Sequence, residues 1–195
     1  IQVVRDVQSV PHPDAVYLSD LPFAAEQNGH GPAERDRSNG ELAALDGGPI
    51  RLNGITYPKG LGVHAYSSLS FALGGNYTRF LTHVGLDDSR NGLCGQVQFQ
   101  VRLDGVVAYT SAPFVDTTAT GTLDLDVGHA NTLTLEVFTL GDPCGDHADW
   151  ADARLLPRPD PGYRYYRFRP TQLRDGGAAN AVELAELALF ADGER

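Results

Sequence analysis

The amino-acid sequence predicts an all-β protein, a β-sandwich of the jelly-roll type. Between residues 15 and 156, short segments recur in which apolar side chains alternate with polar ones or run together, the pattern of β-strands about four to eight residues long. Turn signals such as Asn53-Gly54 and Asp104-Gly105 separate them and supply the positive φ that tight hairpins require. Helical periodicity is almost absent, and many short strands joined by tight turns are typical of sandwiches.

The segment 121–127 shows the strand pattern most clearly. Leu123, Leu125 and Val127 alternate with polar side chains, so we expect one face of this strand to be buried and the other to be wet. In chain order, the expected strands are 15–21, 50–57, 61–65, 67–73, 79–86, 96–103, 106–111, 121–127, 132–138 and 151–156.

Composition divides the chain into a main domain at 16–156 and two extensions. An N-terminal extension occupies 1–15, and PRPDPG at 157–162 predicts a short, stiff, proline-rich linker. The segment 163–195 alternates arginine with tyrosine and phenylalanine, then ends in an apolar stretch that fits a strand or a short helix. About 40 residues are too few for a separate core, so we expect this extension to dock on the main domain, another domain or a neighbouring subunit.

Charge and hydropathy limit the partners. The 195 residues carry a formal net charge of -10 with a pI near 4.9, which disfavours nucleic acid as a partner. No apolar run approaches the roughly 20 residues that cross a bilayer, so no membrane span is predicted. The sequence lacks methionine and begins at Ile1, from which we expect a processed product or an excised fragment that has lost any export signal.

The two cysteines, Cys94 and Cys144, fall in loops next to the expected strands 96–103 and 132–138. Antiparallel pairing of these strands brings the loops together, which favours a disulfide. Two free buried cysteines are the second possibility; a zinc site with ligands such as His147 is a weaker one, because a second cysteine pair is missing. A disulfide indicates an oxidising compartment, and hence an extracellular or cell-surface protein.

Familiar catalytic signatures are absent from the sequence. It has no GxSxG, no HExxH and no glycine-rich phosphate loop, which disfavours nucleophile-elbow hydrolases, zincins and nucleotide enzymes. A glycosidase requires only two carboxylates that face a cleft. Asp87-Asp88 and Glu34 with Asp36 offer such pairs, but solvated or loop-capping carboxylates explain them more simply. We therefore predict no catalytic residue and no enzyme activity.

The loop NGHGPAERDRSNGE at 28–41 is rich in groups that bind cations. Asp36, Asn39, Glu41 and Asp46 offer hard oxygen ligands, and nearby glycines let backbone carbonyls turn inward, so a structural calcium ion is one hypothesis. The other is that Asx turns, serine turns and arginine–carboxylate pairs hold the loop without a metal. The sequence leaves both open.

Several loop residues also suit sugar recognition, which combines a flat ring beneath the apolar face of the sugar with groups that bond its hydroxyls. Two of them have a simpler explanation. Trp150 starts an apolar strand and is more often a core residue, and His64, in the apolar run GLGVHA, is more often a hydrogen-bonded core histidine. The candidate ligand-binding residues are His30, Glu34, Arg35, His64, Tyr66, Arg90, His147 and Trp150.

Six blocks of the chain together resemble the NPCBM domain, also called the family-51 carbohydrate-binding module. They are VYLSDLPF (16–23), NGHGPAERDRSNGE (28–41), LNGITYPKGLGVHA (52–65), FLTHVGLDD (80–88), FQVRLDG (99–105) and DHADWADARL (146–155). The resemblance implies a galactose-binding-like β-sandwich, usually an accessory to secreted glycoside hydrolases, that binds galactose-containing glycans through loops at one end and often carries a structural calcium.

The chain departs from this family at His30, where the NGWGP block usually has tryptophan. Loss of a stacking indole removes about 1–2 kcal/mol from a sugar platform, so we expect glycan binding to be weaker, altered or absent. Beyond the NPCBM-like region, the segment that begins at Tyr163 resembles the opening of a discoidin-like module.

We therefore predict an extracellular, non-catalytic carbohydrate-binding module that recognises glycans through preformed loop groups. One alternative is a structural subunit of an extracellular filament or surface layer, in which 163–195 docks on a neighbour. Another is an accessory domain of a larger secreted glycoside hydrolase, in which case the parent gene continues past Arg195.

Overall fold

The computed structural model describes residues 14–90 and 94–159. The chain divides into two units, Ile1–Pro159 and Asp160–Arg195, and all described residues lie in the first. The expectations for the N-terminal extension before residue 14, the end of the linker and the 163–195 extension fall outside them. The helices of the described part are two 3₁₀ turns, Leu18–Asp20 (η1) and Asp88–Arg90 (η2), and no helix there is long and apolar enough to cross a membrane.

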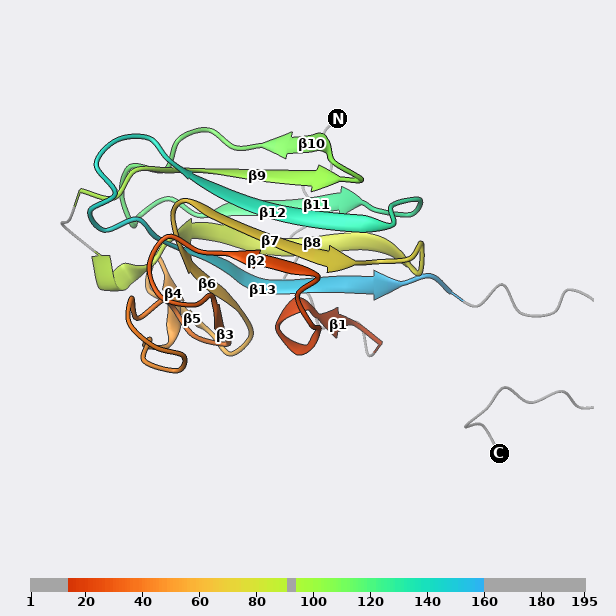
Figure 1. The fold of residues 1–195 in the computed structure, drawn as a ribbon, viewed down its shortest axis with the longest axis horizontal. Coiled ribbons are helices and arrows are strands. Elements are labelled where there is room, and N and C mark those ends of the chain that lie inside the picture. The colour runs from red at the N-terminus through yellow and green to blue at the C-terminus, as the bar shows by residue number, and fades with distance from the viewer. Residues whose placement is uncertain (1–13, 91–93, 160–195) are drawn as a thin grey trace, which may run out of the picture. The chain divides into compact units, whose positions relative to one another are not determined.

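Two antiparallel sheets form the sandwich (Figure 1). Sheet A has the strand order β11-β8-β13-β6-β3, with β1 also paired to β13, and sheet B has the order β10-β9-β12-β7-β2. The strands of sheet A are β1 (Val16–Tyr17), β3 (Glu34–Arg35), β6 (Gly60–His64), β8 (Tyr77–Leu86), β11 (Gly121–Asp126) and β13 (His147–Pro157). Those of sheet B are β2 (Ala25–Gln27), β7 (Ser67–Ala72), β9 (Val97–Leu103), β10 (Val106–Thr110) and β12 (Thr132–Thr139).

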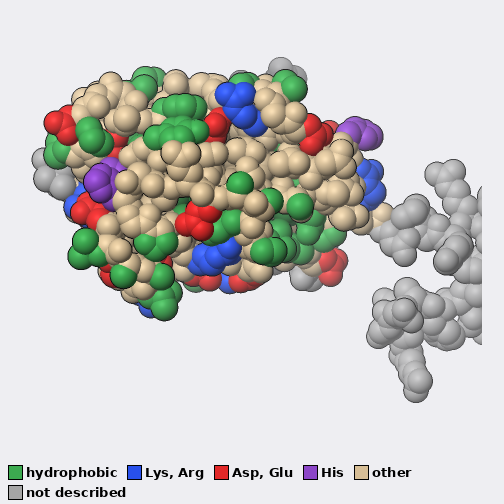
Figure 2. Space-filling view, in the orientation of Figure 1, with side chains coloured by type: hydrophobic (Ala, Val, Ile, Leu, Met, Phe, Trp, Pro, Cys, Tyr) green, Lys and Arg blue, Asp and Glu red, His purple; other side chains and the backbone are tan. Residues whose placement is uncertain are grey.

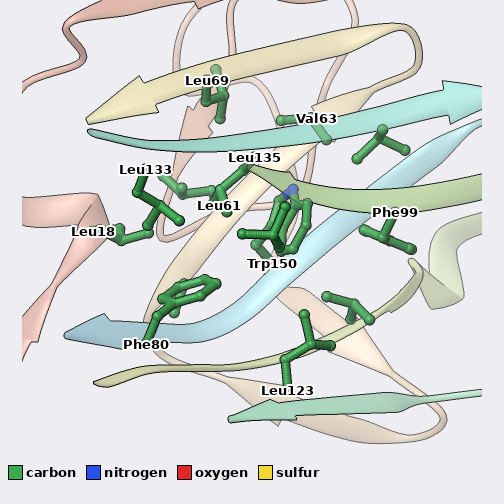
Figure 3. Close-up of a cluster of buried hydrophobic side chains, with 14 of the residues drawn as sticks. Leu18, Leu61, Val63, Leu69, Phe80, Phe99, Leu123, Leu133, Leu135 and Trp150 are labelled. Atoms are coloured by element: carbon green, nitrogen blue, oxygen red, sulfur yellow. The ribbon is translucent and has the colours of Figure 1, made fainter. Parts of the chain in front are cut away.

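The core between the two sheets is apolar. Trp150 of β13 is completely buried, and its ring meets that of Phe99 edge-on, with the ring centroids 5.0 Å apart. Leu61 and Leu135, which come from opposite sheets, pack beside the indole (Figure 3). Burial of an aliphatic side chain of this size stabilises a fold by about 1.5–3 kcal/mol, so these contacts join the sheets into one unit.

Strand β13 lies at the centre of sheet A, between β8 and β6. Its side chains alternate, so Trp150 enters the core while His147 and Asp149 point to the opposite face of the sheet. The register shifts near Asp152, a residue with a φ of 52°, as expected for a β-bulge. One strand therefore supplies both the centre of the core and polar groups on the outer face.

A short hairpin covers part of that outer face. β4 (Ile50–Leu52) and β5 (Ile55–Tyr57) pair around Asn53-Gly54, whose φ angles are 48° and 81°, as a tight hairpin turn requires. Ile50 and Leu52 are buried against Ala151 of β13, in a cluster separate from the main core. The outer face of sheet A is thus packed as well, and polar groups between the hairpin and the sheet lose contact with water.

The prediction of an all-β jelly-roll sandwich is confirmed, but some strand boundaries differ and two edge strands were not predicted. Within 15–21, only Val16–Tyr17 is extended before the chain turns into η1, and the segment 50–57 is a hairpin of two strands. The last strand begins at His147 rather than at residue 151, because residues 147–151 pair with β6 and residues 148–151 also pair with β8. The short edge strands β2 and β3 lack an apolar alternation, so the pattern does not predict them.

Candidate ligand-binding site

The loop that follows β2 is tied to β6 and to itself by two asparagine side chains. Asn28 donates from Nδ2 to the carbonyl of His30 and accepts the backbone N–H of His64 through Oδ1. Asn39 donates to the same His30 carbonyl from the far part of the loop. The backbone of His30 is therefore fixed, although its side chain is exposed.

Three imidazole rings lie close together here, one from this loop and two from the strands beneath it. His64 ends β6 and His147 begins β13, and the two residues are paired across the ladder. Their ring centroids lie 5.1 Å apart, and the ring of His30 lies 4.4 Å from that of His64. His64 and His147 are only 3% and 0% exposed. Figure 2 shows histidine side chains at the surface near both ends of the sandwich, with acidic side chains beside the one at the left.

Glu41 joins these rings from the loop. Its Oε1 lies 2.5 Å from Nε2 of His147 and 3.5 Å from a guanidinium nitrogen of Arg90. The hydrogen bond to His147 lowers the pKa of the Glu41 carboxyl and outweighs the opposing effect of burial. Glu41 therefore carries a negative charge at neutral pH, with its carboxylate held in place from two sides.

Burial keeps the two inner imidazoles neutral. It lowers the pKa of both His64 and His147, because a charged ring loses its hydration there. Nδ1 of His64 lies 2.8 Å from the carbonyl oxygen of Ala65. Since a carbonyl only accepts, Nδ1 carries the proton, and Nε2 of His64 keeps its lone pair.

An open pocket of about 290 Å³ adjoins these groups. His30, Glu41 and His64 line it together with the segment 142–145. The disulfide between Cys94 and Cys144, whose Cα atoms are 5.7 Å apart, ties that segment to the residues before β9 and confirms the predicted pairing. The pocket thus offers a carboxylate, imidazole rings and backbone groups on a braced frame, and such polar groups fix the orientation of a small ligand.

A second pocket, of about 390 Å³, is lined by residues 38–40, 46–49 and 87–90, among others. Next to its lining residue Asp87 lies Asp149, which is fully buried. Burial, reinforced by the charge of Asp87, raises the pKa of Asp149 well above its ordinary value. Neither carboxylate oxygen of Asp149 has a hydrogen-bond donor within the described residues, and the same is true of Oγ of Ser38.

Three of the predicted ligand-binding residues have partners within the fold. Trp150 is wholly buried in the core. Glu34 is 2% exposed, and its Oε1 accepts the N–H of Leu45 at 2.6 Å. Arg35 donates to the backbone carbonyls of Ser19 and Leu21. In each case the protein's own groups occupy the side chain that was expected to face a ligand.

Tyr66 also lies apart from the pocket residues. Its hydroxyl donates to Glu136 at 3.1 Å, and its ring centroid is 5.2 Å from that of Phe138 in β12. The predicted binding residues that the structure brings together, directly or through Glu41, are His30, His64, Arg90 and His147.

The four predicted calcium ligands are not one ligand set. Asp36 binds Lys59 through Oδ2 at 2.9 Å, Asn39 holds the loop backbone, and Asp46 caps its own turn through the N–H groups of residues 42 and 43. Glu41 faces the histidines instead. Each of these four side chains already has a protein partner, and the partners lie in different parts of the fold.

Sequence reasoning missed Asp149 and the association of Glu41 with the histidines. The strand pattern of DHADW contains a usable signal, because alternation places His147 and Asp149 on the face opposite Trp150. Glu41 gives no comparable signal, since it lies 106 residues before His147. Only the closed fold brings these two residues together.

The fold and this pocket define a class of protein: a β-sandwich module that presents a polar, imidazole-lined pocket at one loop end, as lectin-like domains do. The chain belongs to the NPCBM/NEW2 domain family, whose model matches residues 14–156. The resemblance seen in the six sequence blocks is therefore confirmed.

Solved structures of family-51 carbohydrate-binding modules (CBM51) share the fold. CBM51 from Clostridium perfringens GH95, solved in complex with methyl-galactose, is 33% identical with a TM-score of 0.66, over 73% of this chain and 99% of that one. CBM51-2 with INT domains from Clostridium perfringens ZmpB, solved in complex with GlcNAc, is 31% identical with a TM-score of 0.64, over 72% of this chain and 31% of that one.

One curated relative is far longer than this chain. A Renibacterium salmoninarum protein named as an endo-alpha-N-acetylgalactosaminidase is 38% identical over 154 residues, which is 77% of this chain and 10% of the relative. The chain thus spans about a tenth of that relative's length.

Proposed function

We propose that this domain is a non-catalytic carbohydrate-binding module that holds a glycan in the pocket lined by His30, Glu41 and His64. Membership of the NPCBM family, and likeness to modules solved with methyl-galactose and GlcNAc, support carbohydrate as the ligand class. The observation that carries the choice of site is the Glu41 carboxylate, ionised and held by His147 and Arg90 at the pocket.

The chemistry of these groups suits sugar hydroxyls. An ionised carboxylate accepts hydrogen bonds from hydroxyl groups, and such charge-assisted bonds contribute about 1.5–3 kcal/mol each. Glu41 is oriented before any ligand arrives, so little side-chain entropy is lost on binding. The exposed ring of His30 offers a flat face for the C–H side of a sugar, smaller than the indole that the family usually carries there. We propose galactose-type sugars as the preferred ligands.

A glycan array followed by calorimetry with methyl-galactoside and GlcNAc tests this function. The substitution Glu41→Gln is expected to weaken glycan binding by about 10-fold or more, the equivalent of one charge-assisted bond. Asp124→Asn is the matched control. Asp124 lies on the edge strand β11, is a similarly exposed carboxylate and pairs with an arginine, Arg79. A silent array would contradict the glycan function, and equal losses in both variants would contradict the site.

The substitution His30→Trp tests the platform. It is expected to tighten galactoside binding by about 5- to 30-fold, the equivalent of 1–2 kcal/mol of stacking. His129→Trp, at an exposed histidine between β11 and β12, serves as the control for a general effect of a surface indole. Unchanged affinity in His30→Trp would remove His30 from the binding surface.

A structural calcium, which the family implies, fits the buried acids better than the loop. The carboxylate of Asp149 and Oγ of Ser38 lack donors among the described residues, and Asp87 adjoins Asp149. Calcium takes hard oxygen ligands of this kind. When bound, it would supply the positive charge that two buried carboxylates require, and Asp149, Asp87 and Ser38 would hold it.

The competing explanation for these acids is a proton that Asp149 shares with Asp87. Melting curves in calcium and in chelator separate the two, together with the substitution Asp149→Asn. Calcium binding predicts a higher melting temperature in calcium than in chelator, and loss of that difference in the variant. Equal melting temperatures, with stability retained in Asp149→Asn, would favour the shared proton.

The setting that these features support is a secreted protein larger than this chain. The disulfide is typical of an oxidising compartment, and the curated relative is about ten times longer than the matched region, so we propose an extracellular accessory domain beside other domains. A filament or surface-layer subunit would instead polymerise. Polymer in size-exclusion chromatography and microscopy, combined with a silent glycan array, would replace the proposal by that alternative.

A further inference from the structure

The side chains around this pocket also have the types and the spacing of metal ligands. Among the described residues, one ligand atom each from Glu41, His64 and His147 lie within 4.8 Å of one another. The ring of His30 adjoins this group, 4.4 Å from that of His64. We propose that the cluster binds a divalent transition-metal ion of the zinc class, with His64, His147 and Glu41 as ligands and His30 in the fourth position.

The distances are close to those that a metal requires. Ligand atoms bound to zinc at about 2.0–2.2 Å in a tetrahedron lie roughly 3.3–3.6 Å from one another. Here the Glu41–His147 pair is at 2.5 Å, and the other separations within the group are at most 4.8 Å. The ligands that adjust, Glu41 and His30, are exposed loop residues, whereas His64 and His147 are fixed on paired strands.

The hydrogen bonds of the buried rings suit metal binding. His64 donates its Nδ1–H to the Ala65 carbonyl, which leaves Nε2 free as a ligand, and a backbone carbonyl behind the ring is a common partner of metal-binding histidines. His147 meets Glu41 through Nε2. When a metal takes that nitrogen, the ring proton moves to Nδ1, which is buried and has no hydrogen-bond partner among the described residues. His147 stays neutral in this exchange, so no proton has to leave it.

The ligand types select the metal. Imidazole nitrogen suits zinc, cobalt, nickel and copper, whereas calcium and magnesium prefer oxygen ligands. Two histidines with one glutamate form a set that zinc uses in proteins, and in this cluster His30 would take the remaining position. Arg90 opposes the ion, because its guanidinium lies 3.5 Å from Oε1 of Glu41, but the arginine side chain is 27% exposed and can turn toward solvent.

The metal and the glycan would share Glu41, yet the two proposals are independent. Metal binding is measured without sugar, and glycan binding is measured in chelator. If zinc binds Glu41, the carboxylate is no longer available to the sugar, so galactoside binding should be weaker in zinc than in chelator. If the chain binds metal but no glycan, the metal site stands and the proposed glycan-binding function is refuted. If it binds glycan but no metal, the proposed function stands and the metal site is refuted.

The test uses the full 195-residue chain without an affinity tag, stripped with chelator and then desalted. Titration with zinc chloride in a calorimeter is expected to show one ion per chain with micromolar or tighter affinity. Cobalt is expected to give the strong visible absorption of a four-coordinate site. Glu41→Gln and His30→Ala should each weaken zinc binding at least 10-fold, whereas His129→Ala, at an exposed histidine outside the cluster, should not.

Two outcomes would overturn the proposal. One is no saturable zinc binding to the wild-type chain, and the other is wild-type affinity in both Glu41→Gln and His30→Ala, which would mark the bound ion as adventitious. Far-UV circular dichroism checks that the variants fold. Because Glu41 and His30 are both exposed, neither substitution removes a core contact. The two variants are therefore independent tests of the same metal site.

Discussion

Loss of the disulfide between Cys94 and Cys144 is expected to destabilise the domain by about 4 kcal/mol. The two cysteines are separated by 50 residues in the sequence. For a loop of that length, the chain-entropy relation gives a loss of roughly 14 cal/mol/K in the unfolded state, or about 4 kcal/mol at 25 °C. The folded state needs the bond less, because β9 and β12 are already paired next to it, with Val97 opposite Thr139.

Urea unfolding measures this difference directly. With a slope of about 2 kcal/mol/M for a domain of this size, the unfolding midpoint should fall by about 2 M. The wild-type chain in reducing agent and the double variant Cys94→Ser/Cys144→Ser should give the same midpoint, because both lack only the cross-link. A fall of less than about 0.5 M, or different midpoints for the two reduced forms, would refute the entropic reasoning.

Loss of the disulfide should also affect ligand binding in the pocket. The segment 142–145 lines the pocket and contains Cys144, so the reduced domain should bind glycan more weakly even where it remains folded. Calorimetry with methyl-galactoside at low denaturant compares the oxidised and reduced forms. Equal affinities would show that the segment 142–145 holds its position in the pocket without the disulfide.

Three further predictions concern the fold. Gly62→Ala places a Cβ about 2.3 Å from a backbone carbonyl oxygen of the neighbouring loop and should cost about 1–3 kcal/mol in urea unfolding, whereas Gly48→Ala meets nothing within 4 Å and should be nearly neutral. Trp150→Ala should cost about 3–5 kcal/mol by the same measurement, provided that the variant folds. Burial opposes ionisation of Asp36, but hydrogen bonds from Lys59 and from a backbone N–H hold its pKa below the ordinary value of 3.8. Asp36→Asn should therefore lower the free energy of unfolding by about 0.5–1 kcal/mol at neutral pH. That difference should be complete above about pH 4 and vanish as the pH falls through the lowered pKa, because protonation then removes the same interaction from the wild type.

The strands that sequence reasoning predicts well are those with one dry and one wet face. Leu123 in 121–127 is buried as expected, because the period of two is set by the pleat and needs no knowledge of the partner strand. β2 escapes prediction for the opposite reason: Ala25–Gln27 is exposed along its length and is a strand only because β7 offers it an edge.

The site is less predictable, because residue type does not reveal a side chain's partner. Arg35 and Glu34 have the chemistry of sugar-binding residues, but Arg35 finds the carbonyls of Ser19 and Leu21, and Glu34 finds the N–H of Leu45. These partners are separated from them by 11 to 16 residues along an irregular loop. Local rules cannot assign contacts of that kind.

The strand β13 runs from the pocket, where it begins with His147, to the opposite end of the sandwich at Pro157. At about 3.3 Å per residue, its 11 residues span roughly 33 Å from the first to the last. β1 pairs with the far part of this strand, with Val16 opposite Leu155, so the polypeptide enters and leaves the domain at the pole away from the pocket (Figure 1). On the proposed function, a sugar in the pocket would therefore be held roughly 3 nm from the end of the sandwich where Val16 and Pro157 lie.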